Sequence, residues 1–426
     1  MAASTRKVIV LRAYAPPTRH CDAVSRDVRV EDRGRCPRRA RACGGSRKVT
    51  ERAPEREPAD ATTRKRRQVG IFRRPRDTPA AVPPAIAEFW DWWGQARPTI
   101  EASLAAGPEQ PEPGVPGEGL SADTIEELSR RVRKIHSELQ WEIGGSDDRA
   151  PSLTVTGGGD PELRGVAERW FRAAPSGAAA GGWRFHPARQ ADPEMLSQDL
   201  VLGDHEFDLE YVRLGMRADT DRARVHISAY HPDFLFVSEE QQLQVALHVL
   251  DWALGEDDVA RWIGEVSIAI ETPIDSLPPS MLPAVVEQVA EPFGEPAWLT
   301  GEGRTPRGHP KRLGARFPLH RQDYPLCDLH VAITVPYANS NPDRLPVEPS
   351  AGALRAFEKK LAKLGDRAVL AVRETGDGLR VFHLYADPDS GVIGELDQLA
   401  AAWTEGKAKV ASTNDPGWRA FAPYQP

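Results

Sequence analysis

The order of predicted elements near the C-terminus constrains this fold more than any other feature of the chain. From Leu329 to Trp418, short alternating apolar runs and amphipathic stretches follow one another as strand, helix, strand, strand, helix and strand. Gly376-Asp377-Gly378 lies between the two middle strands, as expected of a hairpin turn. The order predicts an α+β fold of ferredoxin-like type, an antiparallel sheet with its helices on one face.

This pattern belongs to a predicted second module, which covers residues 298–426. Its expected strands lie over 329–335, 368–374, 379–385 and 407–412, and its expected helices over 350–365 and 391–402. Ser350 is expected to cap the first of these helices.

A first α+β module of the same type is predicted over residues 121–275, followed by a connecting helix within 276–297. Its longest helix, Glu239 to Leu254, has one apolar face. Segment 224–233 parallels segment 380–389, and each precedes a helix with a Trp-x-x-Gly ending and a last strand. We therefore expect two repeats, each with a single sheet, and chance similarity is the alternative.

A glycine run in the first module has the placement of a phosphate-binding loop. Gly157-Gly158-Gly159-Asp160-Pro161 follows a predicted strand and precedes a helix expected over 162–174. The carboxylates of Asp160 and Glu162 would repel a phosphate at that helix start. We therefore interpret the run as a turn in which Asp160 caps the helix and Pro161 is its first residue.

Residues 69–120 are predicted to hold one helix and a linker. Four large apolar residues recur at helical spacing between Pro84 and Ala96, and the helix is expected to end before Pro98. These residues are Ile86, Phe89, Trp90 and Trp93. Such a stripe is typical of a core helix, and an exposed docking helix is the alternative. The linker is the Pro- and Gly-rich stretch over 107–119.

Charge is distributed unevenly along the chain. Residues 1–68 hold 19 Lys and Arg against 8 Asp and Glu, which leaves 36 against 54 from the totals of 55 and 62. The tail is therefore +11 and the rest of the chain −18. Because the tail shows neither helical nor strand periodicity, we expect it to be disordered. A second interpretation is that it is not translated, since Val69 begins a segment typical of a protein start.

Composition excludes several classes of function. An acidic body repels phosphate backbones, so we expect no nucleic-acid partner. The apolar runs are too short for a membrane span. Cys327 stands alone, and the spacing of Cys21, Cys36 and Cys43 fits no zinc site. We expect a cytoplasmic protein with no metal and no cofactor, and its oligomeric state stays open.

Four side chains form the candidate ligand-binding site. If alternation holds, His330, Arg373, His383 and Tyr385 lie on the open face of the second module's sheet. Imidazoles titrate near neutrality and bind metals, which is why this face could support acid/base chemistry. The interpretation we favour over such a site is that the face packs against His186, His226 and Tyr230 of the first module. No catalytic residue is identified.

Four short motifs give the chain a resemblance to a known family. They are 159–163 (GDPEL), 250–256 (LDWALGE), 324–331 (YPLCDLHV) and 414–418 (NDPGW). With these motifs the chain resembles an uncharacterised bacterial family catalogued as domain of unknown function 695, over most of residues 69–420. The resemblance implies no catalytic residues. Family members are sometimes joined to a module similar to ribonuclease-regulating proteins of ferredoxin-like fold, which implies regulation through protein binding.

The expected function is therefore that of a non-catalytic cytoplasmic interaction or regulatory protein whose partner is another protein. The alternative is a small-molecule-binding protein or hydrolase that uses His330, His383 and Tyr385. The two differ in whether that sheet face lines a cavity or is covered.

Overall fold

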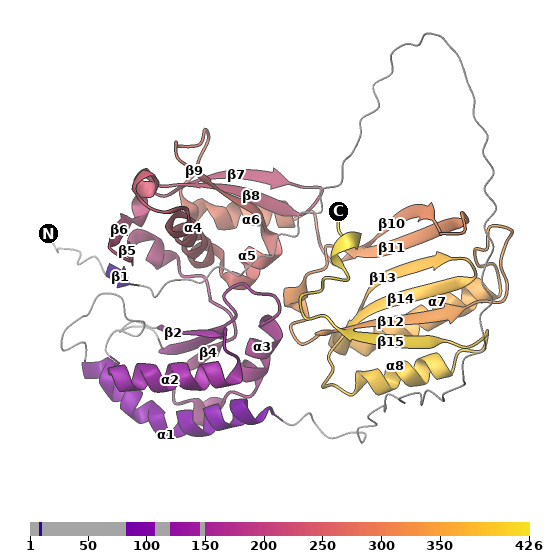
Figure 1. The fold of residues 1–426 in the computed structure, drawn as a ribbon, viewed down its shortest axis with the longest axis horizontal. Helices are drawn as coiled ribbons and strands as arrows, with labels where there is room; N and C mark the ends of the chain where they lie inside the picture. Colours follow the sequence, from indigo (N-terminus) through magenta and orange to yellow (C-terminus); the bar gives the residue numbers. More distant parts are fainter. Residues whose placement is uncertain (1–7, 11–81, 107–119, 145–149) are drawn as a thin grey trace, which may run out of the picture. The chain divides into compact units, whose positions relative to one another are not determined.

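The computed structural model describes residues 8–10, 82–106, 120–144 and 150–426 (Figure 1). These residues form an α+β structure with eight α-helices and several mostly antiparallel sheets. Within the described ranges, no helix has the length and apolar character that a membrane span requires. The predicted linker lies outside the described residues, and so does all of the tail except Val8–Val10, which forms strand β1.

Helices α1 (Pro84–Ala106) and α2 (Ala122–Ile135) pack together and build a first hydrophobic cluster. Ile86, Phe89 and Trp93 of α1 are buried in it, beside Leu128 and Val132 of α2. The interpretation of the tryptophan stripe as core is thus confirmed.

Helix α1 continues through Pro98, so the predicted helix end was wrong. Proline lacks an N–H and costs an interior helix about 3 kcal/mol. Contacts made beyond the proline offset this cost. Ile100 is buried in the cluster, and Glu101 accepts a hydrogen bond of 2.9 Å from the Trp183 indole. Tertiary packing thus overrides the local stop signal.

The first module contains three sheets, with strand orders β2-β3-β4, β1-β5-β6 and β7-β8-β9. The strands are β2 (Gln140–Gly144), β3 (Ser152–Thr156), β4 (Arg184–His186), β5 (Asp199–Leu202), β6 (His205–Asp208), β7 (Arg213–Asp219), β8 (Arg224–Tyr230) and β9 (Ile263–Ala269). The helices after α2 are α3 (Arg164–Arg172), α4 (Glu239–Leu254), α5 (Glu256–Trp262) and α6 (Leu282–Ala290).

The prediction of one antiparallel sheet in this module was therefore wrong. Its apolar side chains divide between two hydrophobic clusters, one around α1, α2 and α3 and one around α4 and α6. Each cluster is covered by its own short strands, and β3–β4 and β8–β9 pair in parallel. Helices α4 and α6 lie on one side of β7-β8-β9 (Figure 1).

The second module has one six-stranded sheet of order β10-β11-β13-β14-β12-β15 in which all neighbours are antiparallel. The strands are β10 (Ala297–Arg304), β11 (Pro310–Phe317), β12 (Leu329–Pro336), β13 (Ala368–Gly376), β14 (Leu379–Ala386) and β15 (Lys409–Asn414), and the helices are α7 (Ser350–Leu361) and α8 (Val392–Ala401). The six elements predicted from the sequence are present in the predicted order. Strands β10 and β11 extend the sheet and were not predicted.

The predicted hairpin turn joins β13 to β14. Asp377 and Gly378 both have positive φ, 53° and 81°, as a two-residue hairpin turn of type I′ requires.

The strand pairing of the two modules differs, so the sheet topology does not support the hypothesis that they are repeats. After β8, the chain passes through α4 and α5 and returns as β9, which pairs directly with β8. After β14, it passes through α8 and returns as β15, which pairs with β12 instead. The two segments share an order of elements but differ in strand pairing.

Candidate functional site

Three of the four predicted site residues lie together on the second module's sheet. His330 of β12 lies directly opposite Tyr385 of β14, and His383 is two residues away on the same face. His330 Nε2 and His383 Nδ1 are 3.1 Å apart, and the two imidazole rings are stacked. The sequence alternation therefore placed these three side chains correctly.

Arg373, the fourth residue, lies on the opposite face, and its predicted placement was wrong. A β-bulge between Leu370 and Val372 shifts the alternation of β13 by one residue. Arg373 therefore shares a face with buried Phe382. Its guanidinium donates to Glu358 of α7 at 2.6 Å and lies over the Trp298 ring. It supports the packing of α7 on the sheet.

Tyr385 is locked in place by the C-terminal segment, residues 415–424. Its side chain is 1% exposed, its hydroxyl donates to Asp415 at 2.6 Å, and its ring stacks on Trp418 at 4.2 Å. Burial, together with the hydrogen bond to the Asp415 carboxylate, raises the pKa of Tyr385. A phenol that is covered and holds its proton this firmly is unsuited to acid/base chemistry.

The two imidazoles are half-buried and partner each other. Burial lowers the pKa of both His330 and His383. A hydrogen bond between their rings requires one nitrogen to donate and the other to accept, so the pair is most stable when at least one ring is neutral. Across the described parts of the chain, no group of three or more His, Cys, Asp or Glu side chains has the arrangement of a metal site.

The C-terminal segment covers much of this face. Trp418 and Phe421 are buried in a cluster with Val369, Ala371 and Tyr385. The indole of Trp418 donates to the Cys327 carbonyl at 2.8 Å. Tyr385 is thus covered by the chain's own C-terminal segment, and the predicted cover by His186, His226 and Tyr230 of the first module was wrong.

The glycine run of the first module holds an internal carboxylate. Glu256 is buried and accepts hydrogen bonds from the Gly159 N–H at 2.7 Å, from the Arg189 N–H at 3.1 Å and from the Thr156 hydroxyl. A phosphate there would meet this charge. The interpretation against phosphate binding is thus supported, for a reason that the sequence did not show.

The predicted cap at this loop was wrong. Asp160 Oδ1 accepts from the Glu162 N–H at 2.8 Å within the turn, and helix α3 begins only at Arg164. The carboxylate therefore closes a local turn instead of capping the helix.

A second candidate surface is the side of β7-β8-β9 that faces away from α4 and α6, called the open face below. The alternate residues Leu214, Val225, Ile227 and Ala229 point into the core, so their neighbours point outward. The outward residues are Arg213, Gly215, Arg217 and Asp219 on β7, Arg224, His226, Ser228 and Tyr230 on β8, and Glu265, Ser267 and Ala269 on β9.

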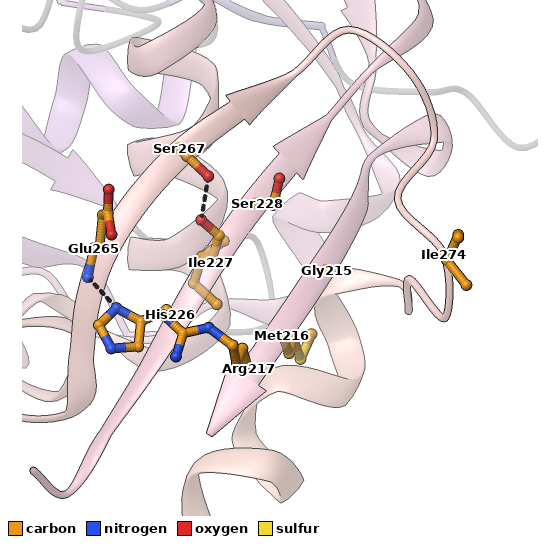
Figure 2. A pocket seen from close by; sticks show the side chains of 9 residues that line it. All are labelled: Gly215, Met216, Arg217, His226, Ile227, Ser228, Glu265, Ser267 and Ile274. Carbon is orange, nitrogen blue, oxygen red and sulfur yellow. Dashed lines mark hydrogen bonds between the residues drawn. The ribbon is translucent and has the colours of Figure 1, made fainter. Parts of the chain in front are cut away.

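The open face contains a shallow hollow of about 330 Å³ (Figure 2). Three small residues, Gly215, Ser228 and Ser267, form one row across the three strands and make its floor. The longer side chains of Arg217, His226, Glu265 and Ile274 surround this floor (Figure 2).

His226 is held in place by a hydrogen bond to its Nδ1. Its Nδ1 accepts from the Glu265 N–H at 3.0 Å, so Nε2 carries the proton in the neutral ring. Nε2 lies 3.5 Å from the Asp219 carboxylate. In a serine hydrolase the nitrogen facing away from the carboxylate accepts the serine proton. Here a backbone N–H occupies that nitrogen, so Ser228 gains no base from His226.

Of the residues around this hollow, the sequence reasoning had singled out only His226. Alternation along β7 places Arg217 on the same face as Gly215, but a register irregularity opposite Ile263–Val266 breaks the alternation of β9, so the position of Glu265 was not predictable in this way. Ile274 lies in a loop without periodicity, and no sequence pattern marks it.

Comparison of the chain with protein-family models, with curated proteins and with solved structures found no match. The resemblance to the domain of unknown function 695 therefore stays a prediction that rests on the sequence motifs alone.

Proposed function

We propose that this chain is a non-catalytic protein that binds a partner protein through the open face of β7-β8-β9. The observation that carries the proposal is the exposure of a large apolar side chain, Ile274, at the wall of the hollow. Ile274 is 93% exposed and Ile270 61% exposed, and both belong to the loop over 270–277 that follows β9. Exposed apolar residues gathered around a polar, shallow surface are typical of interaction sites.

The geometry of the second module supports a non-catalytic function. Tyr385 is covered and hydrogen-bonded to Asp415, while His330 and His383 bond to each other. A small-molecule site or hydrolase centre would need these groups to face a cavity. They contact the C-terminal segment instead, so the alternative function gains no support from their arrangement.

The proposal extends to the fold of the second module and to the compartment. Strands β13, β14, β12 and β15, with α7 and α8 as crossovers, have the order and directions of a ferredoxin-like sandwich, and this supports assigning that fold. Cys327 is a buried free thiol, which suits the reducing cytoplasm.

The test is affinity capture from an extract of the source cells with the full-length chain as bait. Three baits are compared by quantitative mass spectrometry: wild type, Ile274→Asp and the control Leu379→Asp. Leu379 is also an exposed apolar residue, but it lies at the start of β14 in the other module. Equal unfolding temperatures of the baits show that the exposed substitutions leave the fold intact.

We expect at least one protein that wild type and Leu379→Asp capture equally and that Ile274→Asp loses, because a charge at the contact must be desolvated on binding. Identical sets of captured proteins for all three baits would contradict the proposed surface.

A further inference from the structure

The two arginines that point outward from β7 are left without carboxylate partners. Arg213 and Arg217 lie on either side of Gly215 along β7, and the side chain of Arg217 lines the hollow. Within the described ranges, neither arginine forms an ion pair. The Arg213 guanidinium donates to the carbonyls of Glu210 and Val212, each at 2.8 Å.

The chain around these two cations is acidic. Outside the tail, Asp and Glu exceed Lys and Arg by 54 to 36. Some other arginines of the first module form ion pairs with carboxylates. Arg164 pairs with Glu168 and Asp257, and Arg261 pairs with Asp258. Arg213 and Arg217 lie on the same face of β7 without a carboxylate ion pair among the described residues, so they give that part of the surface a local positive potential on an acidic molecule.

The open face also has two acidic side chains, Asp219 on β7 and Glu265 on β9. Asp219 is near His226 at 3.5 Å and Arg222 at 3.7 Å, so cationic or polar groups surround it. Glu265 is on β9, the strand farthest from β7 in this sheet. Arg213 and Arg217 thus leave an excess of positive charge on β7, where Asp219 already lies beside Arg222 and His226, and an acidic ligand is favoured on that side.

The loop over 270–277 adds an apolar contact on the same side. Its Pro273 lies so close to Gly215 that a Cβ at position 215 would come within 3.1 Å of the proline side chain. Leu277 pairs with Leu214 through backbone hydrogen bonds, which ties the loop to β7. The exposed Ile274 therefore belongs to the same part of the surface as Arg213 and Arg217.

We propose that the open face binds an extended acidic peptide segment of a partner protein. Carboxylates of the segment pair with Arg213 and Arg217, and its apolar side chains pack on Ile274. An extended segment suits the surface because its successive side chains point in opposite directions, which allows acidic and apolar residues to reach different walls of a shallow hollow. This inference rests on the proposed function and names its partner's chemistry.

The test measures binding of labelled ten-residue peptides to the full-length chain by fluorescence anisotropy. Three peptides alternate Leu with Glu, Gln or Lys. The protein variants are wild type, Arg217→Glu, Ile274→Asp and the control Arg307→Glu. Arg307 is another exposed arginine, and it lies between β10 and β11 in the second module.

We expect the Glu peptide to bind wild type and Arg307→Glu equally and Arg217→Glu at least about tenfold more weakly, since an attractive charge pair becomes repulsive. Added salt should weaken the binding. The inference is overturned if Arg217→Glu leaves binding of the Glu peptide unchanged, or if the Lys peptide binds as tightly.

Failure of this inference is distinguishable from failure of the proposed function. If the Gln and Glu peptides bind equally and Ile274→Asp abolishes both, the acidic preference is wrong, but the open face remains a binding surface. If no peptide binds while Ile274→Asp still loses captured proteins, the acidic-peptide inference alone is wrong. If no peptide binds and capture is also unaffected, both are wrong.

Discussion

His330 and His383 place two half-buried imidazoles in contact on neighbouring strands. Their environment includes Asp415 beside His330, and Glu374 and Lys311 near His383. The ring of Tyr424 lies 5.8 Å from that of His383. Because burial lowers the pKa of both histidines, the folded protein favours their neutral forms.

This has a consequence for stability at acidic pH. The unfolded chain takes up protons on these histidines near pH 6.5, whereas the folded chain does so only at lower pH. The unfolded state therefore binds more protons in this window, and stability falls as the pH drops below about 6.5. We expect the double variant His330→Gln/His383→Gln to lose less stability than wild type between pH 7 and pH 5, measured by urea unfolding.

The control for this prediction is the free energy of unfolding of wild type and of the double variant at pH 8, where both proteins have neutral side chains at these positions. If the free energies of unfolding of wild type and of the double variant fell in parallel with pH, protonation of these two histidines would not explain the loss of stability. Loss of one equivalent of bound metal in a folded double variant would contradict the structural role of the pair.

Single residues show where alternation is a reliable guide and where it fails. His330, His383 and Tyr385 were placed correctly because β12 and β14 are regular. Arg373 was misplaced because a bulge is a property of strand pairing and has no mark in one strand's sequence. Ser350 was expected to cap α7, but it is the first helical residue, and its hydroxyl accepts from the Asn339 N–H at 2.9 Å.

Among the elements, helix α4 was predicted to the residue, because its apolar stripe has a clear start and stop signal at its ends. Helix α4 begins after Ser238, which forms a capping box with Gln241, and ends before Gly255. The β10–β11 hairpin was missed because β10 is exposed on both faces and has no alternation of apolar and polar residues. Sheet partners were also unpredictable, since pairing depends on contacts far apart in the sequence.

The packing of α4 and α7 gives a prediction about stability. Leu250 and Phe357 are buried in separate hydrophobic clusters. We expect Leu250→Ala and Phe357→Ala each to lower the free energy of unfolding by about 2–5 kcal/mol, the cost of a cavity in a packed core. Chemical denaturation measures this. Substitution of exposed Leu299 by Ala is the control and should change stability much less.

The C-terminal segment packs on the face of the second module's sheet that lies opposite to α7 and α8, and forms a second hydrophobic cluster there. Trp418 stacks on Tyr385, donates to the Cys327 carbonyl and is 5% exposed. We expect Trp418→Ala to destabilise the protein by about 3–5 kcal/mol and to make residues 415–424 sensitive to limited proteolysis. Unchanged stability and unchanged cleavage would show that the segment does not hold the sheet face closed.

On the scale of the whole molecule, the four motifs behind the family resemblance associate in two pairs. Gly159 of the first motif binds Glu256 at the end of the second. The Asp415 N–H donates to the Asp328 carbonyl at 2.8 Å, which joins the other two. These motifs are therefore accounted for by folding contacts. The sequence showed each motif separately but gave no indication of which motifs contact each other in the fold.

The tail provides a further prediction. Of residues 1–68, the structure describes only Val8–Val10, which pair in parallel with β5. Since three backbone pairings are small beside the hydrophobic clusters of the body, we expect deletion of residues 1–68 to leave the unfolding temperature nearly unchanged. A fall of more than a few degrees in calorimetry would show that the tail contributes to the folded core.

Binding of a partner protein to the open face should slow the exchange of the amides that it covers. Hydrogen–deuterium exchange of the full-length chain, alone and with a protein whose capture depends on Ile274, tests it most directly. We predict that amides of β7, β9 and residues 270–277 exchange more slowly in the complex, while those of β12 and β14 stay unchanged. Slower exchange confined to β12, β14 and residues 415–424 would contradict binding at the open face.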